Sequence, residues 1–273
     1  MTLSKQKQVY VVPTWQCNLH CPHCFVHKYT DTYNKEVFIT KLKELKKKYP
    51  KASFILHGGE PTLYPKRYLE IMDTNIIDSI CTNLITEPEI IEDLNKRDIP
   101  IATSWNPNRF NLQHYLQWLN NIKSLNNKPL VLITLDQDLL HFDIDMFTKV
   151  IKDLEEVGIE EILFEPLVDN TLTNDFQNKI DEWLCNIYTL WRYKRIKIKN
   201  LIEEQILHWD FKCNSITLLP DGTVRPGCII GERCRNILIK CFDCKYAKVC
   251  RPCELHTRCS FYPKFYEKVK ANA

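Results

Sequence analysis

The stretch VYVVPTWQCNLHCPHC, residues 9–24, joins a short apolar run to a loop that carries three cysteines. The run VYVV consists of β-branched and aromatic residues, which predicts a buried strand. Cys17, Cys21 and Cys24 follow it with the spacing CxxxCxxC. A segment of helical period comes next, at 35–48. The stretch therefore predicts the first unit of a repeated β-α fold.

The same alternation continues to about residue 170. Short apolar runs predict six strands, at 9–12, 53–57, 76–81, 101–105, 130–135 and 161–167. Helical patterns lie between and after them, at roughly 35–48, 66–74, 87–97, 112–125, 143–157 and 174–194. Six parallel strands with outer helices predict an α/β protein with a partial (β/α)6 TIM-like barrel. In such folds ligands gather at the carboxyl ends of the strands.

Composition and charge narrow the functional class. The chain has 273 residues, with 37 Lys and Arg against 34 Asp and Glu, a formal net charge of +3. A charge this close to neutral does not favour a nucleic-acid partner. No apolar run approaches the roughly 18 residues that cross a bilayer, and the first residues lack the apolar core of a signal peptide. We therefore expect a cytoplasmic protein without a membrane partner.

The 13 cysteines indicate metal ligation, because disulfides are rare in a reducing cytosol. Three lie in the first loop and eight lie between residues 213 and 259. Cys81 and Cys185 stand alone and are expected to pack as small apolar residues, although Cys81 is near the barrel mouth, where a thiol can donate a hydrogen atom. The distribution predicts two separate metal-binding regions.

The composition and the periodicity of the sequence change near residue 200. Beyond it, Cys, Pro and Arg replace the helical repeats, and Asp221-Gly222 between apolar segments predicts a hairpin. We predict a barrel domain at 1–200 and a small Cys-rich extension at 201–273. The extension has little core to bury, so we expect metal ligation to stabilise it.

The cysteine loop resembles the signature of the radical S-adenosylmethionine (SAM) superfamily, which has CxxxCxxC after its first barrel strand. The resemblance implies that Cys17, Cys21 and Cys24 hold a [4Fe–4S] cluster whose fourth iron binds the amino and carboxylate groups of SAM. It also places His23 beside the adenine. The alternative is a structural zinc site with His20 or His23 as the fourth ligand.

The segment His57-Gly58-Gly59-Glu60-Pro61 ends the second predicted strand, where the superfamily carries its GGEP sequence. Two glycines let the backbone approach a small ligand, and a carboxylate can pair with an ammonium group. The resemblance therefore implies that Gly58, Gly59 and Glu60 contact the methionine part of SAM. On structural grounds alone, the segment is a turn that ends a strand.

Four further candidates end the later strands. Asn83 follows Thr82 at the end of strand three, as a Thr-Asn pair commonly does in the superfamily, and is expected to contact SAM. Ser104 ends strand four, where the superfamily contacts the ribose or carboxylate of SAM. Asp136 and Glu165 end strands five and six, where inward carboxylates can act as bases. Hydrogen bonding within the scaffold is the alternative role for both.

The C-terminal cysteines resemble the SPASM extension of radical SAM enzymes, which has a hairpin between its first two cysteines. The resemblance implies two auxiliary [4Fe–4S] clusters. Their ligands are then Cys213, Cys228, Cys253 and Cys234 for one cluster, and Cys241, Cys244, Cys250 and Cys259 for the other. The alternative is a pair of zinc-ribbon knuckles.

These resemblances imply a radical SAM enzyme, which cleaves SAM reductively to a 5′-deoxyadenosyl radical that abstracts hydrogen from a substrate. Many relatives with this extension modify peptides, including ribosomally made ones, so we expect a peptide or protein substrate and a reductant such as flavodoxin or ferredoxin. Ile229 stands where relatives that form a carbonyl have an acidic residue, which favours a crosslink or an epimerisation. The alternatives are a small-molecule or nucleotide substrate, and a non-catalytic zinc-binding adaptor.

Overall fold

The computed structural model describes residues 7–21, 24, 26–166, 174–191, 196–198 and 215–226. The chain divides into two compact units. The first unit consists of Met1–Thr103, Arg109–Pro129 and Cys213–Gly231, and the second of Ser104–Asn108, Leu130–Lys212 and Glu232–Ala273. Each unit has its own strands and helices.

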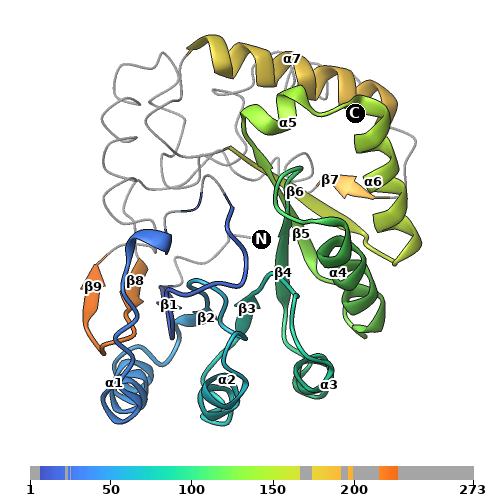
Figure 1. Ribbon diagram of the computed structural model, residues 1–273. Helices are drawn as coiled ribbons and strands as arrows, with labels where there is room; N and C mark the ends of the chain where they lie inside the picture. The colour runs from blue at the N-terminus through green and yellow to red at the C-terminus, as the bar shows by residue number, and fades with distance from the viewer. Residues whose placement is uncertain are drawn as a thin grey trace. The chain divides into compact units, whose positions relative to one another are not determined.

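The strands of the first unit are mostly parallel (Figure 1). They are β1 (Gln8–Val11), β2 (Ser53–Leu56), β3 (Ser79–Cys81), the first residues of β4 (Ile101–Trp105), β8 (Ser215–Leu218) and β9 (Val224–Pro226). β2, β3 and β4 follow β1 on one side, and β8 lies parallel to β1 on its other side. β9 pairs antiparallel with β8, which confirms the hairpin predicted at Asp221-Gly222. Gly222 has a φ of 83°, so the turn uses the backbone freedom of glycine.

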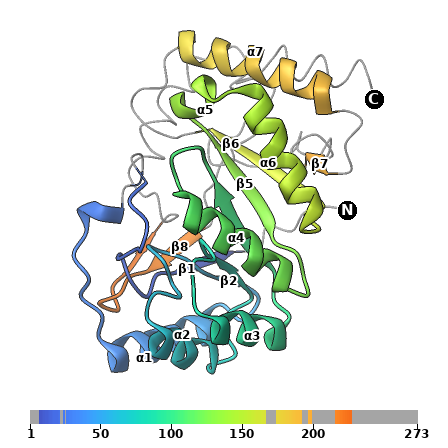
Figure 2. The ribbon, with the colours of Figure 1, turned by 45° about the vertical axis from the view of Figure 1, so that its right-hand side comes forward.

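Helices α1, α2 and α3 lie in a row along one side of β1, β2 and β3 (Figures 1 and 2). They are α1 (Lys35–Lys48), α2 (Pro65–Met72) and α3 (Pro88–Arg97), and the unit also contains α4 (Leu112–Ser124) and the short 3₁₀ helix η1 (Val26–Lys28). The Asn34 side chain caps α1 by accepting from the Val37 N–H, and prolines begin α2 and α3. One side of β1 and of β2 is fully buried; Val9, Val11, Phe54 and Leu56 expose no surface. Burial of each such side chain contributes about 1.5–3 kcal/mol.

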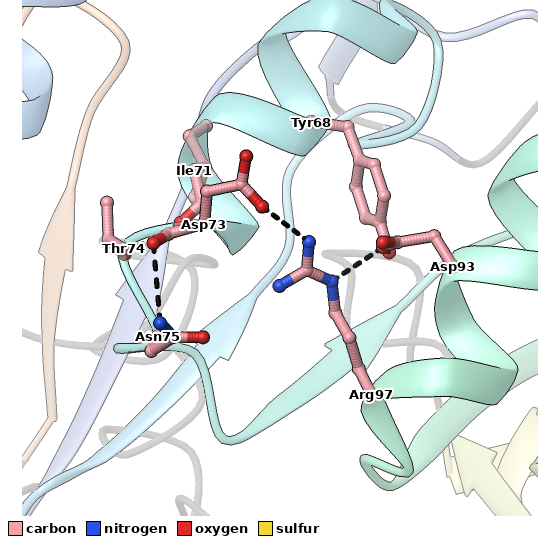
Figure 3. Close-up of polar contacts among 7 residues, drawn as sticks. All are labelled: Tyr68, Ile71, Asp73, Thr74, Asn75, Asp93 and Arg97. Carbon is pink, nitrogen blue, oxygen red and sulfur yellow. Dashed lines mark hydrogen bonds and ion pairs between the residues drawn. The ribbon is translucent and has the colours of Figure 1, made fainter.

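A polar network joins the end of α2 to α3 (Figure 3). Arg97 of α3 donates through Nη2 to Asp73 Oδ1 and through Nε to Asp93 Oδ2, both at 2.7 Å. Tyr68 of α2 donates its hydroxyl to the same Asp93 oxygen at 2.9 Å. Because Tyr68 is fully buried, the network fixes α2 and α3 against each other on the outside of the sheet.

The second unit contains β5 (Leu130–Leu135), β6 (Glu161–Pro166) and β7 (Lys197–Ile198), all parallel. Its helices are α5 (Gln137–His141), α6 (Ile144–Glu156) and α7 (Asn174–Trp191), and α7 runs against α5 (Figure 2). Trp183 of α7 packs edge-on against Phe147 of α6, with ring centroids 5.1 Å apart, and also against Phe164 of β6. These rings form part of the core of the unit.

The predicted fold class is confirmed: the protein is α/β, with parallel strands arranged as in a partial TIM-like barrel, and the sheet formed by the described residues is not closed. Five of the six predicted strands match within two residues. β3 is shorter than the predicted 76–81 because Asp78 uses its N–H and its carboxylate to bond the Phe54 backbone. None of the helices in the described ranges is long and apolar enough to cross a membrane. The domain boundary near residue 200 remains a prediction.

Candidate active site

The three N-terminal cysteines lie on the loop that leaves β1 at its carboxyl end. Trp15 anchors this loop, since it is buried and stacks on Tyr29 with ring centroids 4.7 Å apart. Cys17 and Cys24 pack against the same apolar cluster, and Cys21 is 6% exposed. The Cys24 N–H donates to the Cys21 carbonyl oxygen at 3.0 Å, which forms a turn between the last two thiols.

Arg67 of α2 holds the base of the cysteine loop. Its Nη1 donates to the Pro13 carbonyl oxygen at 3.0 Å and pairs with Asp31 Oδ2 at 2.9 Å. The guanidinium also lies over the rings of Tyr33 and Tyr64, at 4.0 and 4.5 Å from their centroids. Segments on both sides of the three cysteines are thereby tied to α2.

Gly58 and Gly59 bring the loop after β2 into backbone contact with the cysteine loop. The Gly59 N–H donates to Thr14 O at 2.9 Å, and the Glu60 N–H donates to Gln16 O at 2.7 Å. A Cβ on Gly59 would lie 2.1 Å from Gln16 O, and one on Gly58 would lie 2.5 Å from Thr14 O. In this structure the absence of side chains at the two glycines therefore makes room for the backbone of the cysteine loop.

Glu60 is 1% exposed and binds the protein through both carboxylate oxygens. Oε1 accepts from the Thr62 N–H at 3.0 Å, from the Thr62 hydroxyl at 2.7 Å and from the Thr82 hydroxyl at 2.7 Å. Oε2 accepts from the Asn83 N–H at 2.7 Å. Burial raises the pKa of Glu60, and these donors oppose that rise. Glu60 thus connects the ends of β2 and β3, while its contact with SAM ammonium remains a prediction.

Asn83 continues this connection to the cysteine loop. Its Nδ2 donates to Asn18 Oδ1 at 2.7 Å and lies 3.7 Å from Cys17 Sγ, and its Oδ1 accepts from the Ile85 N–H. Asn18 in turn donates to Ile85 O at 2.8 Å. Asn83 is 2% exposed, so the amide is fixed in place. The sequence predicted Asn83 but did not reveal Asn18, which accepts its hydrogen bond, or Thr62, which donates to Glu60.

His57 precedes the two glycines and faces Tyr10 of β1, with ring centroids 6.1 Å apart. Its Nδ1 accepts from the Gly58 N–H at 2.7 Å, which requires this nitrogen to be unprotonated. Burial lowers the pKa of His57 to about 4. The imidazole is therefore neutral at physiological pH.

Sequence reasoning missed Arg109, which follows β4. Its Nη1 lies 3.6 Å from Cys21 Sγ, within range of an N–H···S hydrogen bond. Burial raises the pKa of Cys17 to about 11, and the charge of Arg109 opposes that rise. The sequence feature that could have indicated Arg109 is its position, as a cationic residue, just beyond the carboxyl end of a barrel strand, where side chains reach the site.

The surroundings of the three cysteines bear on which cofactor they can hold. Among the described residues, no group of three His, Cys, Asp or Glu side chains is arranged to hold one metal ion. A tetrahedral zinc ion needs its thiolates gathered around one atom, whereas a [4Fe–4S] cubane binds each thiolate at a different iron. Cys21 is buried, and N–H donors and a cation lie near the sulfurs of Cys17 and Cys21, which suits an anionic cluster. The three cysteines therefore fit a [4Fe–4S] cluster, and their assignment as its ligands remains a prediction.

Ser104 and Asp136 belong to the second unit. Asp136 is 4% exposed and caps α5, since its Oδ1 accepts from the Leu139 N–H at 2.9 Å. Its Oδ2 accepts from Asn106 Nδ2 at 2.7 Å. These bonds favour the scaffold role over that of a base. Ser104 is half-buried on β4.

Several predicted site residues lie outside the described residues. These are His23, Ile229 and the eight C-terminal cysteines, Cys213, Cys228, Cys234, Cys241, Cys244, Cys250, Cys253 and Cys259. For Glu165 the structure describes only the backbone, in β6. Their roles remain predictions.

Comparison with known proteins gives a family and a fold. The family model described as the Radical SAM superfamily matches residues 11–161. The structure "native anSMEcpe with bound AdoMet and Cp18Cys peptide" is similar with a TM-score of 0.69 and 19% identity, covering 98% of this chain and 97% of that one. No curated protein matches the chain.

A second solved protein, SuiB of Streptococcus suis, has the same fold at 15% identity. SuiB bound to S-adenosylmethionine has a TM-score of 0.62, covering 89% of this chain and 72% of that one. SuiB bound to its precursor peptide SuiA has a TM-score of 0.57, covering 81% and 59%.

Proposed function

This chain belongs to the radical SAM superfamily, and from that premise we propose that it modifies a peptide or protein substrate by SAM-dependent radical chemistry. The observation that carries the proposal is the cysteine loop, whose three cysteines follow the carboxyl end of β1 and whose backbone is hydrogen-bonded to the GGEP segment. A peptide substrate is supported by solved structures of the same fold that contain bound peptides.

Each residue of the site has a role in this proposal. Cys17, Cys21 and Cys24 hold a [4Fe–4S] cluster, which, when bound with SAM, supplies the electron that generates a 5′-deoxyadenosyl radical able to abstract hydrogen. Gly59 and Glu60 fix the loop that presents the thiols. His23, Gly58, Asn83 and Ser104 complete the predicted set of SAM contacts.

The C-terminal extension has a supporting role in the proposal. Its eight cysteines form a SPASM-type pattern with enough thiolates for two auxiliary [4Fe–4S] clusters. Flavodoxin or ferredoxin serves as the reductant. Because Ile229 cannot act as a base, a crosslink or an epimerisation fits the site better than oxidation to a carbonyl.

Anaerobic reconstitution tests the proposal. The wild-type protein is expected to hold about twelve irons per chain, as three cubanes require, and to form 5′-deoxyadenosine from SAM with dithionite. The variant with Cys17, Cys21 and Cys24 all changed to Ala should lose about four irons and all cleavage. Cys185→Ala is the matched control, since Cys185 stands apart from both cysteine groups. A zinc-loaded protein, or cleavage by the triple variant, refutes the proposal.

The substrate class needs a separate measurement. Candidate precursor peptides, incubated in D2O with the holoenzyme, SAM and reductant, should lose two hydrogens on crosslinking or gain one deuterium in place of hydrogen on epimerisation. Turnover of a nucleotide or another small molecule, with no mass change in any peptide, supports the alternative substrate instead.

A further inference from the structure

We propose that Arg109 is a positioning residue that donates an N–H···S hydrogen bond to the Cys21 thiolate and so raises the reduction potential of the N-terminal cluster. The proposal rests on the function proposed above, because it assumes that Cys21 binds that cluster. Its first basis is the distance of 3.6 Å between Arg109 Nη1 and Cys21 Sγ.

The second basis is the unused hydrogen-bonding capacity of the guanidinium in the part of the chain that the structure describes. Among the described residues, no carboxylate pairs with Arg109, and its Nε is buried without a hydrogen-bond partner. A buried donor without an acceptor costs about 1–3 kcal/mol. Such a donor beside Cys21 suits an acceptor that arrives with the cofactor, such as a cluster sulfide.

The third basis is the support behind Arg109. Its guanidinium lies 5.6 Å from the Phe110 ring centroid, and Phe110 packs on Trp118 of α4 at 5.3 Å. Trp118 is fully buried and donates Nε1 to Thr103 Oγ1 on β4 at 3.0 Å. This chain of contacts ties the loop that carries Arg109 to both β4 and α4. The position of the cation is therefore set by the fold of the first unit.

The effect on the cluster follows from charge. One-electron reduction adds a negative charge to a centre that is already anionic with three thiolates. A fixed cation and an N–H donor on a ligand sulfur stabilise the reduced form more than the oxidised form. Arg109 therefore makes the cluster easier to reduce, which is the step that every turnover needs.

The test is the midpoint potential of the N-terminal cluster without SAM, followed by EPR in a reductive titration of the holoenzyme. The signal is identified as the one missing from the variant that lacks Cys17, Cys21 and Cys24. Arg109→Met should lower the equilibrium constant for reduction about tenfold, which is about 59 mV for one electron. Arg109→Lys keeps the charge and should shift the potential less.

Lys123→Met is the matched control, because it removes one positive charge from an exposed position on α4 and should leave the potential unchanged. If the midpoint potential of Arg109→Met equals that of the wild type, the inference is overturned. This holds also when the variant binds SAM more weakly. If Arg109→Met does not fold, Arg109→Gln, which also removes the positive charge, takes its place, and a wild-type potential in that variant overturns the inference. A wild-type protein with no N-terminal cluster instead refutes the proposed function itself.

Discussion

At the scale of single residues, the first prediction concerns Glu60, whose carboxylate we expect to stabilise the fold. Glu60→Ala leaves the donors of Thr62, Thr82 and Asn83 buried without an acceptor. We expect the free energy of unfolding of the cluster-free protein to fall by about 3 kcal/mol, measured by urea denaturation. Thr62→Val removes one donor of the set and should cost about 1 kcal/mol. Unchanged stability combined with weaker SAM binding would assign Glu60 to the ligand alone.

His57 predicts a pH dependence of stability. Its pKa is about 4 in the folded protein and about 6.5 in the unfolded chain, so the unfolded chain binds more protons between these values. Stability is therefore complete above pH 6.5 and falls as the pH drops toward 4. His57 keeps some exposed surface, so we expect a loss of about 1–2 kcal/mol by pH 5.

The measurement is urea denaturation of wild type and His57→Gln across this pH range. The wild type should lose stability relative to His57→Gln as the pH falls, because glutamine does not titrate. Parallel stability curves for the two proteins contradict the prediction.

Single residues also mark the limit of sequence reasoning. The CxxxCxxC and GGEP spacings are local, so Cys17 and Glu60 could be found without coordinates. Asn18, Thr62 and Arg109 act through contacts that only folding creates; the contact between Arg109 and Cys21 joins residues 88 positions apart. No periodicity reports such a pair, and a cation in a loop is usually solvated.

At the scale of elements, Gly59 decides how close the β2 loop comes to the cysteine loop. Gly59→Ala places a methyl group 2.1 Å from Gln16 O, a backbone atom that cannot rotate away. We expect the variant to lose the N-terminal cluster, measured as about four irons per chain and the loss of SAM cleavage. Gly222→Ala is the control for strain outside the cysteine loop, because its φ of 83° and the contact with Val37 oppose an alanine, but the methyl group meets no residue of that loop, so cleavage should remain intact. Full cleavage by Gly59→Ala would show that the two loops can separate.

Most of the elements were predictable, because most strands of the barrel are short buried runs and most helices have a clear start, but the short helix α5 was missed. Pro65 and Pro88 begin α2 and α3, and an αL residue, Asp98, ends α3. The pairing of β8 with β1 was not predictable. Those strands are parallel, and a parallel partner leaves no turn signal between them.

At the scale of the whole molecule, the two cysteine groups should load independently. Changing Cys241, Cys244, Cys250 and Cys259 to Ala should remove about four irons per chain. Reductive SAM cleavage measured in the absence of substrate should continue. Substrate modification should fall to background if the extension takes part in it. The measurement pairs iron analysis with 5′-deoxyadenosine and peptide assays. Loss of uncoupled SAM cleavage in this variant would show that the two regions depend on each other.

The pairing of β1 with β8 also bears on how the chain folds as it leaves the ribosome. Val9 lies opposite Ile216, and the Val12 N–H donates to Leu218 O. Until more than two hundred residues have been synthesised, β1 has an unpaired edge that another strand can occupy. Contacts this distant in sequence close slowly, so the nascent chain spends this time exposed to misfolding and aggregation. The need for chaperones during synthesis should therefore depend on how quickly Ser215–Leu218 pairs with that edge.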